Sequence, residues 1–380
     1  METSLQKSQF SIPPGFIDLG LGDPQFSLLP LELMRQAAEE CLGQNDPEFL
    51  QYGAEQGDGT FRQSLAKFLS RGYVCPVEPG SLFITNGASM GLHLICTFFT
   101  RPGDTVFVEE PTYFIALRIF ADHDLRLVPI RTDENGLLID SLEEELTKSH
   151  PKFLYIIPTY QNPTGRTLST EHRERLVSLS HQHDFLVVAD EVYHFLSYSS
   201  QPPKPFAADT ETGDIISLGS FSKILAPGLR LGWLQANAGI IHRFVNSGLL
   251  DSGGGMNPFT SAIVCRVLET GRLDDNIAQL IAAYRLRVSV MDTALRQYIP
   301  GVEYTLPQGG YFFWIHLPNG INASELQRWA EEFKVGFRPG ELFSCRGGMR
   351  DYIRLSYVFY EPGELEQGVQ RLKQSLDKME

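Results

Sequence analysis

Residues 220–233 read Ser220-Phe221-Ser222-Lys223-Ile224-Leu225-Ala226-Pro227-Gly228-Leu229-Arg230-Leu231-Gly232-Trp233. An apolar run of strand length, Ile215–Leu218, precedes this segment, and a second run, Leu231–Gln235, closes it. Between the two runs stand hydroxyl, cationic and Gly/Pro residues, which are typical of loops that join buried strands. The segment therefore predicts a strand–loop–strand unit of an α/β sheet, with Lys223 in the loop.

The same alternation extends upstream of this unit. The candidate strands are Leu82–Thr85, Thr105–Val108, Leu125–Ile130, Phe153–Ile157, Leu186–Ala189, Ile215–Leu218 and Leu231–Gln235. Helices are expected near residues 90–99, 113–121, 141–148 and 170–183. This order predicts a mostly parallel, seven-stranded sheet sandwiched by helices. Ligands of such sheets bind beyond the carboxyl ends of the strands, which selects Asn86–Ser89, Asn162, Asp190 and Lys223.

The length of the chain, 380 residues, predicts two domains, because a single hydrophobic core rarely serves so many. Residues 273–298 carry apolar side chains at helical spacing and are long enough to bridge two domains. Strand-like runs follow at Tyr311–Ile315 and Ile353–Tyr357, and a polar helix is expected after Glu361. The predicted domains are a large one at 46–285 and a smaller α+β one built from both termini, 1–45 and 286–380.

Composition and charge narrow the possible partners. The chain has 32 Lys plus Arg against 46 Asp plus Glu, a net charge of -14, which argues against general binding to nucleic acid. The first residues, METSLQKSQFSIPPG, lack a signal-peptide run, and no later apolar run reaches membrane-spanning length. We therefore expect a cytoplasmic protein without membrane contact. The five scattered cysteines should be reduced thiols, and His181-x-His183 is too sparse for a metal site, so no metal is expected.

Lys223 is the first candidate for chemistry. A desolvated lysine amine can lose its proton and attack an aldehyde. The alternative is an ordinary solvated loop lysine, but this leaves Ser220, Ser222 and Arg230 at fixed offsets unexplained. Two hydroxyls and a guanidinium suit a phosphate, because they supply hydrogen-bond donors to its oxygens. Lysine and phosphate site together indicate a phosphorylated aldehyde.

Two further polar residues follow predicted strands. Asp190 ends the run Phe185–Ala189, where its carboxylate could pair with a pyridine nitrogen and keep it protonated. A helix cap or turn aspartate is the alternative. Asn162 lies in Gln161-Asn162-Pro163-Thr164-Gly165, which is either simply a sharp turn or a turn that directs the Asn162 amide at the ligand.

The segment Thr85-Asn86-Gly87-Ala88-Ser89-Met90-Gly91 follows a strand and opens a helix. Amides at a helix start bind phosphate. The same residues match the G-x-S-x-G elbow of a serine hydrolase, with Ser89 as nucleophile and Asp190 and His316 as possible partners. Against this alternative, the only glycine triplet, Gly253–Gly255, lies downstream, so no HGGG-type oxyanion segment precedes the serine.

Arg354, in Asp351-Tyr352-Ile353-Arg354-Leu355-Ser356, places a cation in an otherwise apolar strand. A buried charge is costly unless it is paired, so the residue is either part of a structural salt bridge or binds a ligand. In the second case the guanidinium would grip a substrate carboxylate with two hydrogen bonds.

Taken together, these segments resemble the fold type I pyridoxal-phosphate enzymes, within the class I/II aminotransferases. The resemblance covers nearly the whole chain. It rests on Tyr52-Gly53, Gly57 to Leu65, the 85–91 turn, Glu109-Glu110-Pro111-Thr112-Tyr113, Pro158 to Gly165, Asp190-Glu191-Val192-Tyr193, Ser220 to Trp233, Gln308 to Trp314 and Arg354-Leu355-Ser356.

The resemblance implies a role for each of these site residues. Lys223 would hold pyridoxal 5'-phosphate as a Schiff base and move the proton between the substrate Cα and the cofactor. Asp190 would pair with the pyridine nitrogen, Asn162 and Tyr193 would bind the ring hydroxyl, and Tyr113 would stack on the ring. The phosphate would be held by Gly87, Ala88, Ser89, Ser220, Ser222 and Arg230, with Tyr52 reaching it from the partner subunit of a homodimer. Arg354, Gly22 and Asn162 would bind the substrate α-carboxylate.

One departure concerns the phosphate turn. Relatives of the aminoadipate and kynurenine type often have Gly-Ser-Gln-Gln where this chain has Gly87-Ala88-Ser89-Met90, so Ala88 can offer only its backbone.

The motifs identify the cofactor rather than the reaction, since transamination, β-elimination and decarboxylation all withdraw electrons from Cα. We expect an aminotransferase that moves the amino group of an L-amino acid to a 2-oxo acid by a PLP/PMP ping-pong mechanism, with a C–S β-lyase as the alternative. A non-catalytic, effector-sensing domain is a further alternative, because such domains occur in bacterial regulators. Phe26, Leu28 and Leu29 follow Gly22 and predict a side-chain pocket for an apolar or aromatic donor.

Overall fold

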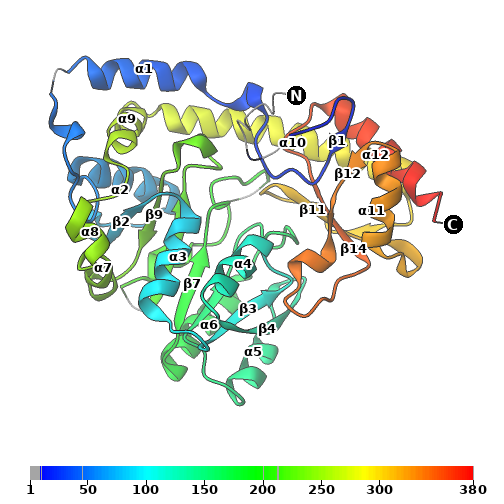
Figure 1. Cartoon of the computed structure of the whole chain (residues 1–380), viewed down its shortest axis with the longest axis horizontal. Helices are drawn as coiled ribbons and strands as arrows, with labels where there is room; N and C mark the ends of the chain where they lie inside the picture. The colour runs from blue at the N-terminus through cyan, green and yellow to red at the C-terminus, as the bar shows by residue number, and fades with distance from the viewer. Residues whose placement is uncertain (1–8, 10, 45, 200, 212–213, 380) are drawn as a thin grey trace, which may run out of the picture.

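The computed structural model describes residues 9, 11–44, 46–199, 201–211 and 214–379 (Figure 1). Its centre is an eight-stranded sheet with the strand order β2-β9-β8-β7-β6-β3-β4-β5. The strands are β2 (Leu82–Thr85), β9 (Gly232–Gln235), β8 (Ile215–Ser220), β7 (Leu186–Asp190), β6 (Phe153–Ile156), β3 (Thr105–Glu110), β4 (Arg126–Asp133) and β5 (Gly136–Leu137). The α/β class and the seven strands expected from the sequence are confirmed.

The sheet departs from the prediction at one edge, where β5 adds an eighth strand. Its two residues form a hairpin with the end of β4, pairing Thr132 with Leu137 and Asp133 with Gly136. So short a strand has no periodicity of its own, which is why the sequence pattern missed it. The sheet is mostly parallel, because only β9 runs antiparallel to both of its neighbours, β2 and β8, among the seven longer strands.

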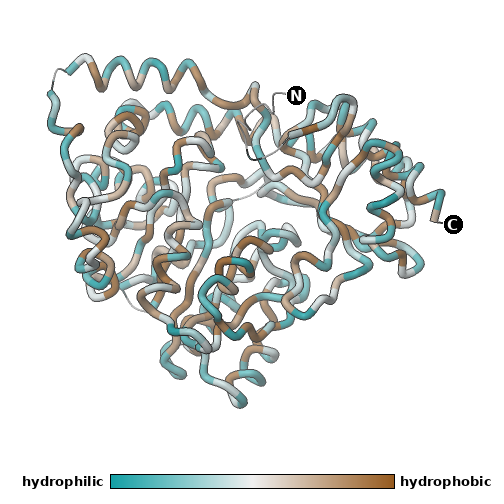
Figure 2. Tube along the Cα trace, in the orientation of Figure 1, coloured by the Kyte–Doolittle hydropathy of each residue, from teal (hydrophilic) through white to brown (hydrophobic). Residues whose placement is uncertain are grey.

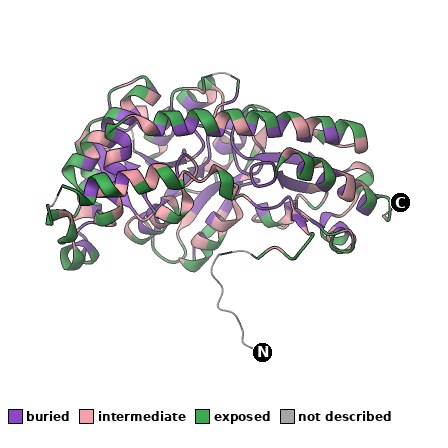
Figure 3. Ribbon diagram, turned by 90° about the horizontal axis from the view of Figure 1, so that it is seen from above, coloured by how far each residue is buried: buried purple, intermediate pink, exposed green. Residues whose placement is uncertain are grey.

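Helices cover both faces of this sheet. Those expected from the sequence are α3 (Ala88–Phe99), α4 (Phe114–Asp122), α5 (Ile139–Leu146) and α6 (Thr170–His183). Alternate strand residues enter two separate cores: Tyr155 and Val188 face a core with α3 and α4, whereas Leu154 and Val187 face one with α5 and α6. This alternation follows from the two-residue period of a strand. Figure 3 shows the strands largely buried and the outer faces of the helices exposed.

The remaining large elements are α1 (Leu31–Leu42), α2 (Gly59–Tyr73), α7 (Ala238–Val245), α8 (Gly248–Gly253), α9 (Pro258–Glu269) and α10 (Arg272–Tyr298). The 27 residues of α10 form the long helix expected at 273–298, and it packs against α9 at one end of the molecule and α12 (Pro362–Leu376) at the other (Figure 1). No helix in the described part of the chain is both long and apolar enough to span a membrane.

The C-terminal part contains a four-stranded sheet and two helices. Its strand order is β10 (Glu303–Tyr304), β11 (Phe312–His316), β14 (Tyr352–Ser356) and β13 (Arg338–Pro339), with α11 (Ala323–Glu332) and α12 packed beside it. The expected strands at Tyr311–Ile315 and Ile353–Tyr357 thus appear, shifted by one residue.

The N-terminal segment contacts both parts of the molecule. β1 (Ile17–Asp18) pairs in parallel with β12 (Val335–Gly336) of the C-terminal part. In contrast, α1 packs along α9, and its Glu40 forms a 2.9 Å ion pair with Arg272, the first residue of α10. Hydrophilic and hydrophobic residues alternate along α1 (Figure 2), as one-sided packing requires. Residues 1–8, 10 and 45 of the predicted small-domain segment lie outside the described residues, and the two-domain division remains a proposal.

Candidate active site

The polar residues selected from the sequence lie at the carboxyl ends of neighbouring strands. Asp190 is the last residue of β7, Lys223 follows the end of β8, and Asn162 follows β6. Because these three strands are adjacent and parallel, their ends meet at one edge of the sheet. The small sheet contributes Arg354 from β14, which bonds directly to Asn162.

Lys223 is half-buried, with contacts from two distant parts of the chain. Its Nζ donates to the carbonyl of Gly22 at 3.2 Å and lies 4.9 Å from the ring centroid of Tyr311. Burial lowers the pKa of Lys223 below its ordinary 10.5, and the negative charge of Asp23 partly opposes this shift. A lysine amine with a lowered pKa releases its proton more readily and is therefore a better nucleophile.

Asp190 is a buried carboxylate with one free oxygen. Its Oδ2 accepts a hydrogen bond from Tyr155 Oη at 2.8 Å. Within the described residues, its Oδ1 is buried and has no hydrogen-bond partner. Burial raises the pKa of Asp190 from 3.8 to about 6, against the Tyr155 hydrogen bond, which lowers it. Asp190 ends β7 and no helix of the described chain begins directly after it, so it is not a helix cap, and its Oδ1 is available to a hydrogen-bond donor.

The 85–91 turn and the 220–230 loop meet beside α3. Arg230, in the left-handed region at φ 46°, donates from Nη2 to the carbonyl of Asn86 at 3.4 Å. Gly87 has φ 88°, a backbone conformation that favours glycine, and a Cβ at this position would lie 2.9 Å from the Nη2 of Arg230.

The two loop serines, Ser220 and Ser222, are joined by a 2.9 Å hydrogen bond between their hydroxyls. Ala88 and Ser89 are the first two residues of α3, where backbone amides lack intrahelical acceptors. Six donor residues predicted for one phosphate therefore converge from two loops.

Arg354 is 3% exposed and is surrounded by aromatic rings. Its guanidinium carbon lies 3.9 Å from the ring centroid of Phe312, 5.0 Å from that of Phe343 and 5.8 Å from that of Phe114. Its two hydrogen bonds go to Asn162 Oδ1 at 2.9 Å and to the carbonyl of Gly20 at 2.8 Å.

Among the described residues, these partners of Arg354 are neutral oxygens, and no carboxylate forms a salt bridge with it. Burial lowers the pKa of Arg354 to about 10. In the described chain its Nε is also buried and has no hydrogen-bond partner. A cation held in this way is suited to an anionic ligand.

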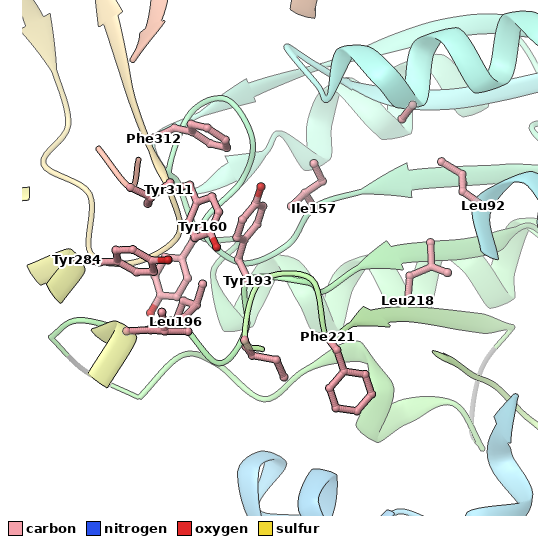
Figure 4. Close-up of a cluster of buried hydrophobic side chains, with 14 of the residues drawn as sticks. Leu92, Ile157, Tyr160, Tyr193, Leu196, Leu218, Phe221, Tyr284, Tyr311 and Phe312 are labelled. Atoms are coloured by element: carbon pink, nitrogen blue, oxygen red, sulfur yellow. The ribbon is translucent and has the colours of Figure 1, made fainter. Parts of the chain in front are cut away.

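Two tyrosines predicted to contact the cofactor ring line the same region. Tyr193 is buried, with its ring 5.4 Å from that of Tyr311 and 6.2 Å from that of Phe312. Figure 4 shows Tyr160, Tyr193 and Tyr311 gathered together, with Phe312 nearby. Tyr113 is the N-cap residue directly before α4, and burial raises the pKa of its hydroxyl to about 12, so it is a neutral ring at physiological pH.

Two sequence predictions stand apart from this cluster. Tyr52 is 82% exposed on the surface of its own chain. The serine-hydrolase alternative is wrong, because His316 Nε2 lies 2.9 Å from Asp351 and its Nδ1 lies 3.4 Å from Glu303, rather than beside Asp190.

Three buried polar residues beside the site were missed from the sequence. They are Tyr155, Glu109 and Gln161; Glu109 accepts a hydrogen bond from the Ile157 amide at 2.8 Å, and Gln161 donates to the Pro111 carbonyl at 2.7 Å. The predicted strand ended at Val108, whereas β3 continues to Glu110. A carboxylate inside an apolar strand is the same signal that identified Arg354, and it would have found Glu109.

The site fits pyridoxal phosphate on three observations. Asp190 Oδ1 is a buried acceptor without a donor, as a protonated pyridine nitrogen requires. The convergent donors around Arg230 and the start of α3 suit the phosphate. Lys223, with a lowered pKa, lies near the ends of the same strands and suits the aldehyde.

Comparisons with known proteins agree with this chemistry. The family model "Aminotransferase class I and II" matches residues 14–372. The aromatic-amino-acid aminotransferase 1 of Thermococcus litoralis is 35% identical, and the alignment covers 95% of this chain and 88% of that protein. The 2-aminoadipate transaminase of Thermus thermophilus is 32% identical, covering 96% of this chain and 90% of that protein.

A solved structure shows the same fold in an enzyme of this kind. The kynurenine aminotransferase of Pyrococcus horikoshii, determined in complex with PMP, superposes with a TM-score of 0.90 at 33% identity, and the match covers 96% of this chain and 91% of that one. The chain therefore belongs to the class I and II aminotransferases and is a pyridoxal-phosphate-dependent amino-acid aminotransferase.

Proposed function

We propose that this aminotransferase uses an apolar or aromatic L-amino acid as donor and a 2-oxo acid as acceptor, with the residues of the site in the roles given below. The observation that carries the donor class is the aromatic surround of Arg354, formed by Phe312, Phe343 and Phe114. Rings beside a carboxylate-binding guanidinium offer apolar surface to the side chain of the bound amino acid.

Several residues would hold the cofactor. Asp190 Oδ1 would accept a hydrogen bond from the protonated pyridine nitrogen, Tyr193 and Asn162 would contact the ring hydroxyl, and Tyr113 would cover the ring. The phosphate binds to the amides of Gly87, Ala88 and Ser89, the hydroxyls of Ser220 and Ser222, and the Arg230 guanidinium. When bound, pyridoxal phosphate withdraws electrons from the substrate Cα and carries the amino group between the two half-reactions of a ping-pong cycle.

Lys223 holds the aldehyde and then moves the proton. Once freed by the substrate amine, its Nζ would move the proton between the substrate Cα and the cofactor. Its lowered pKa supports this role, because a general base works best when its pKa lies nearer the working pH. The Gly22 carbonyl accepts a hydrogen bond from this amine at 3.2 Å and so helps to fix its position.

Arg354 orients the donor. Its guanidinium binds the α-carboxylate in a bidentate manner, and Asn162 and the Gly22 backbone support the same group. This grip fixes the direction of the Cα–H bond relative to Lys223, so that proton transfer occurs within the complex.

Asp23 supports a preference against acidic donors. It follows Gly22 and is close enough to Lys223, Tyr113 and Tyr193 to affect the pKa of each. A carboxylate side chain of glutamate or 2-aminoadipate would meet this negative charge. Phe26, Leu28 and Leu29, the next apolar residues of the segment, add to the proposed pocket; Phe26 packs edge-on against Phe359 at 5.8 Å.

A homodimer is the proposed assembly. Tyr52, Leu50, Leu249 and Phe259 are exposed hydrophobic residues on the η2 (Glu48–Leu50), α8 and α9 region. A second copy that covered this region would bury it and could bring Tyr52 to the phosphate of the neighbouring site. Light scattering after size exclusion should give twice the mass of one chain; a monomer with full activity would contradict the shared site.

We also propose a cytoplasmic location, which the five free thiols support because disulfides are rare in that compartment.

The donor preference is tested by single-turnover spectroscopy of the holoenzyme. Phenylalanine, tyrosine, leucine, glutamate and 2-aminoadipate are mixed separately with it, and the loss of the absorbance of the lysine-bound pyridoxal form is followed. We expect the aromatic and apolar donors to react faster than the acidic ones, with recovery on addition of a 2-oxo acid. Faster reaction of glutamate or 2-aminoadipate would refute the donor class, and pyruvate and ammonia from a cysteine-type substrate, without amino transfer, would indicate the C–S lyase.

A further inference from the structure

Tyr155 lies directly behind the carboxylate that would bind the cofactor. It is in the middle of β6, has no exposed surface, and its hydroxyl donates to Asp190 Oδ2 at 2.8 Å. The two residues belong to neighbouring parallel strands, β6 and β7, with Tyr155 paired to Val188 in the register. The contact is therefore set by the sheet itself and not by a loop.

The Tyr155 hydroxyl decides which oxygen of Asp190 is available. One oxygen accepts from Tyr155, and the other, Oδ1, is the buried atom without a partner. A carboxylate bound on one side by a rigid donor cannot rotate without breaking that bond. The Tyr155 ring is itself immobilised, because it packs edge-on against Phe120 at 5.5 Å.

The same hydrogen bond acts on the charge of Asp190. Burial favours the neutral acid and raises the pKa of Asp190 to about 6, while donation from Tyr155 favours the ionised form. A further buried carboxyl, Glu109, stands on β3 next to β6, and its pKa is raised to about 8, mainly by burial and also by the negative charge of Asp190. Without the Tyr155 hydrogen bond, the pKa of Asp190 would rise further, because less would oppose the effect of burial.

We propose that Tyr155 is a positioning residue that holds Asp190 ionised with Oδ1 directed at the pyridine nitrogen of pyridoxal phosphate. Tyr155 acts through Asp190 and does not touch the cofactor. The inference rests on the proposed role of Asp190 in the preceding section. It predicts that the protonation of the cofactor ring nitrogen depends on a hydroxyl one strand away from Asp190.

The test compares Tyr155→Phe with Tyr357→Phe. Both tyrosines are fully buried and hydrogen-bonded, but the Tyr357 hydroxyl bonds to the Gly309 carbonyl at 3.1 Å and to Tyr198, so this variant controls for the loss of a buried hydroxyl. The readouts are the affinity of each apoenzyme for pyridoxal phosphate and the ¹⁵N chemical shift of the ring nitrogen in isotopically labelled, bound cofactor. Asp190→Asn and the double variant complete a mutant cycle.

We expect Tyr155→Phe to weaken pyridoxal phosphate binding about 10-fold, the loss typical when a hydrogen bond to a charged group is removed. The ¹⁵N shift should move toward the neutral pyridine value, and kcat should fall more than KM changes. Tyr357→Phe should leave the ¹⁵N shift unchanged, and in the Asp190→Asn background the substitution at 155 should have little further effect.

Two outcomes would overturn the inference, and they differ in what else they reject. If Asp190→Asn weakens binding and shifts the ¹⁵N signal but Tyr155→Phe does neither, Tyr155 has only a structural role and the proposed site stands. If Asp190→Asn itself leaves both readouts unchanged, the role proposed for Asp190 fails as well. Neither readout depends on which amino acid the enzyme uses.

Discussion

Replacing Arg354 by lysine tests the proposed carboxylate grip most directly. Arginine can present two parallel N–H groups to a carboxylate, whereas lysine keeps the positive charge but offers a single point of contact. Each hydrogen bond to a charged group contributes about 1.5–3 kcal/mol. The loss of one therefore lowers the affinity for the carboxylate by about 10- to 100-fold. Because Arg354 is 3% exposed, little of this should be screened by solvent.

The assay should separate the carboxylate from the rest of the donor. We expect kcat/KM for phenylalanine to fall by about 10- to 100-fold in Arg354→Lys. The affinity for 3-phenylpropanoate, which has the ring and the carboxylate, should fall by a similar factor. The affinity for 3-phenylpropan-1-ol, which lacks the carboxylate, should stay the same, because the aromatic surround is left in place.

A matched control is Arg62→Lys. Arg62 is a half-buried arginine of α2 that donates to the carbonyls of Gly57 at 3.0 Å and Pro79 at 2.8 Å, outside the site. This variant can lower stability but should leave both ligand affinities unchanged. If Arg354→Lys weakened the acid and the alcohol equally, Arg354 would be supporting the pocket without binding the carboxylate, and the reasoning would be refuted.

Three further predictions concern single residues. Lys223→Ala should abolish turnover and leave any bound cofactor without a covalent bond to the protein, as mass spectrometry after borohydride reduction would show; retained catalysis would overturn the role of Lys223. Asp23→Asn should raise the rate with glutamate relative to phenylalanine in single turnover, because a negative charge is removed, and an unchanged ratio would exclude Asp23 from donor selection. Burial raises the pKa of Glu109 from 4.5 to about 8, so the folded state binds more protons than the unfolded one in this window. The free energy of unfolding of the apoenzyme should therefore fall as pH rises from 4.5 to 8, by at most about 1.4 kcal/mol per pH unit from this group. In Glu109→Gln, urea unfolding at several pH values should show a flatter dependence, whereas an unchanged slope would mean that Glu109 is ionised throughout.

The strands and helices that build the sheet were predictable from local pattern. Apolar runs bounded by turn residues predicted the seven longer strands and the helices between them. In an α/β sheet, the strand ends are also where ligands bind, so Asp190, Asn162 and Lys223 could be selected without knowing how the strands are ordered. Arg354 was found because a lone charge in an apolar strand has few structural explanations.

Contacts between distant segments could not be predicted from the local sequence pattern. Helix α1 belongs to the N-terminal segment predicted for the small domain, yet it packs against α9, because its apolar face finds a partner there. The aromatic rings around Arg354 come from β11, α4 and the 340–343 turn, three parts of the chain that no local pattern connects.

Asp190 illustrates both what the sequence determines and what only the tertiary structure determines. Its place at the end of an apolar run is a property of the sequence, and that place was enough to propose a carboxylate at the cofactor. The bond from Tyr155 to one oxygen, and the burial that leaves the other without a donor, depend on which strand lies beside β7. Strand order is decided by the packing of the whole sheet, because residues 155 and 190 meet only when β6 and β7 pair in register. The sequence alone thus determined which groups are present at the strand ends, and the tertiary structure decided which of their atoms are free to bind.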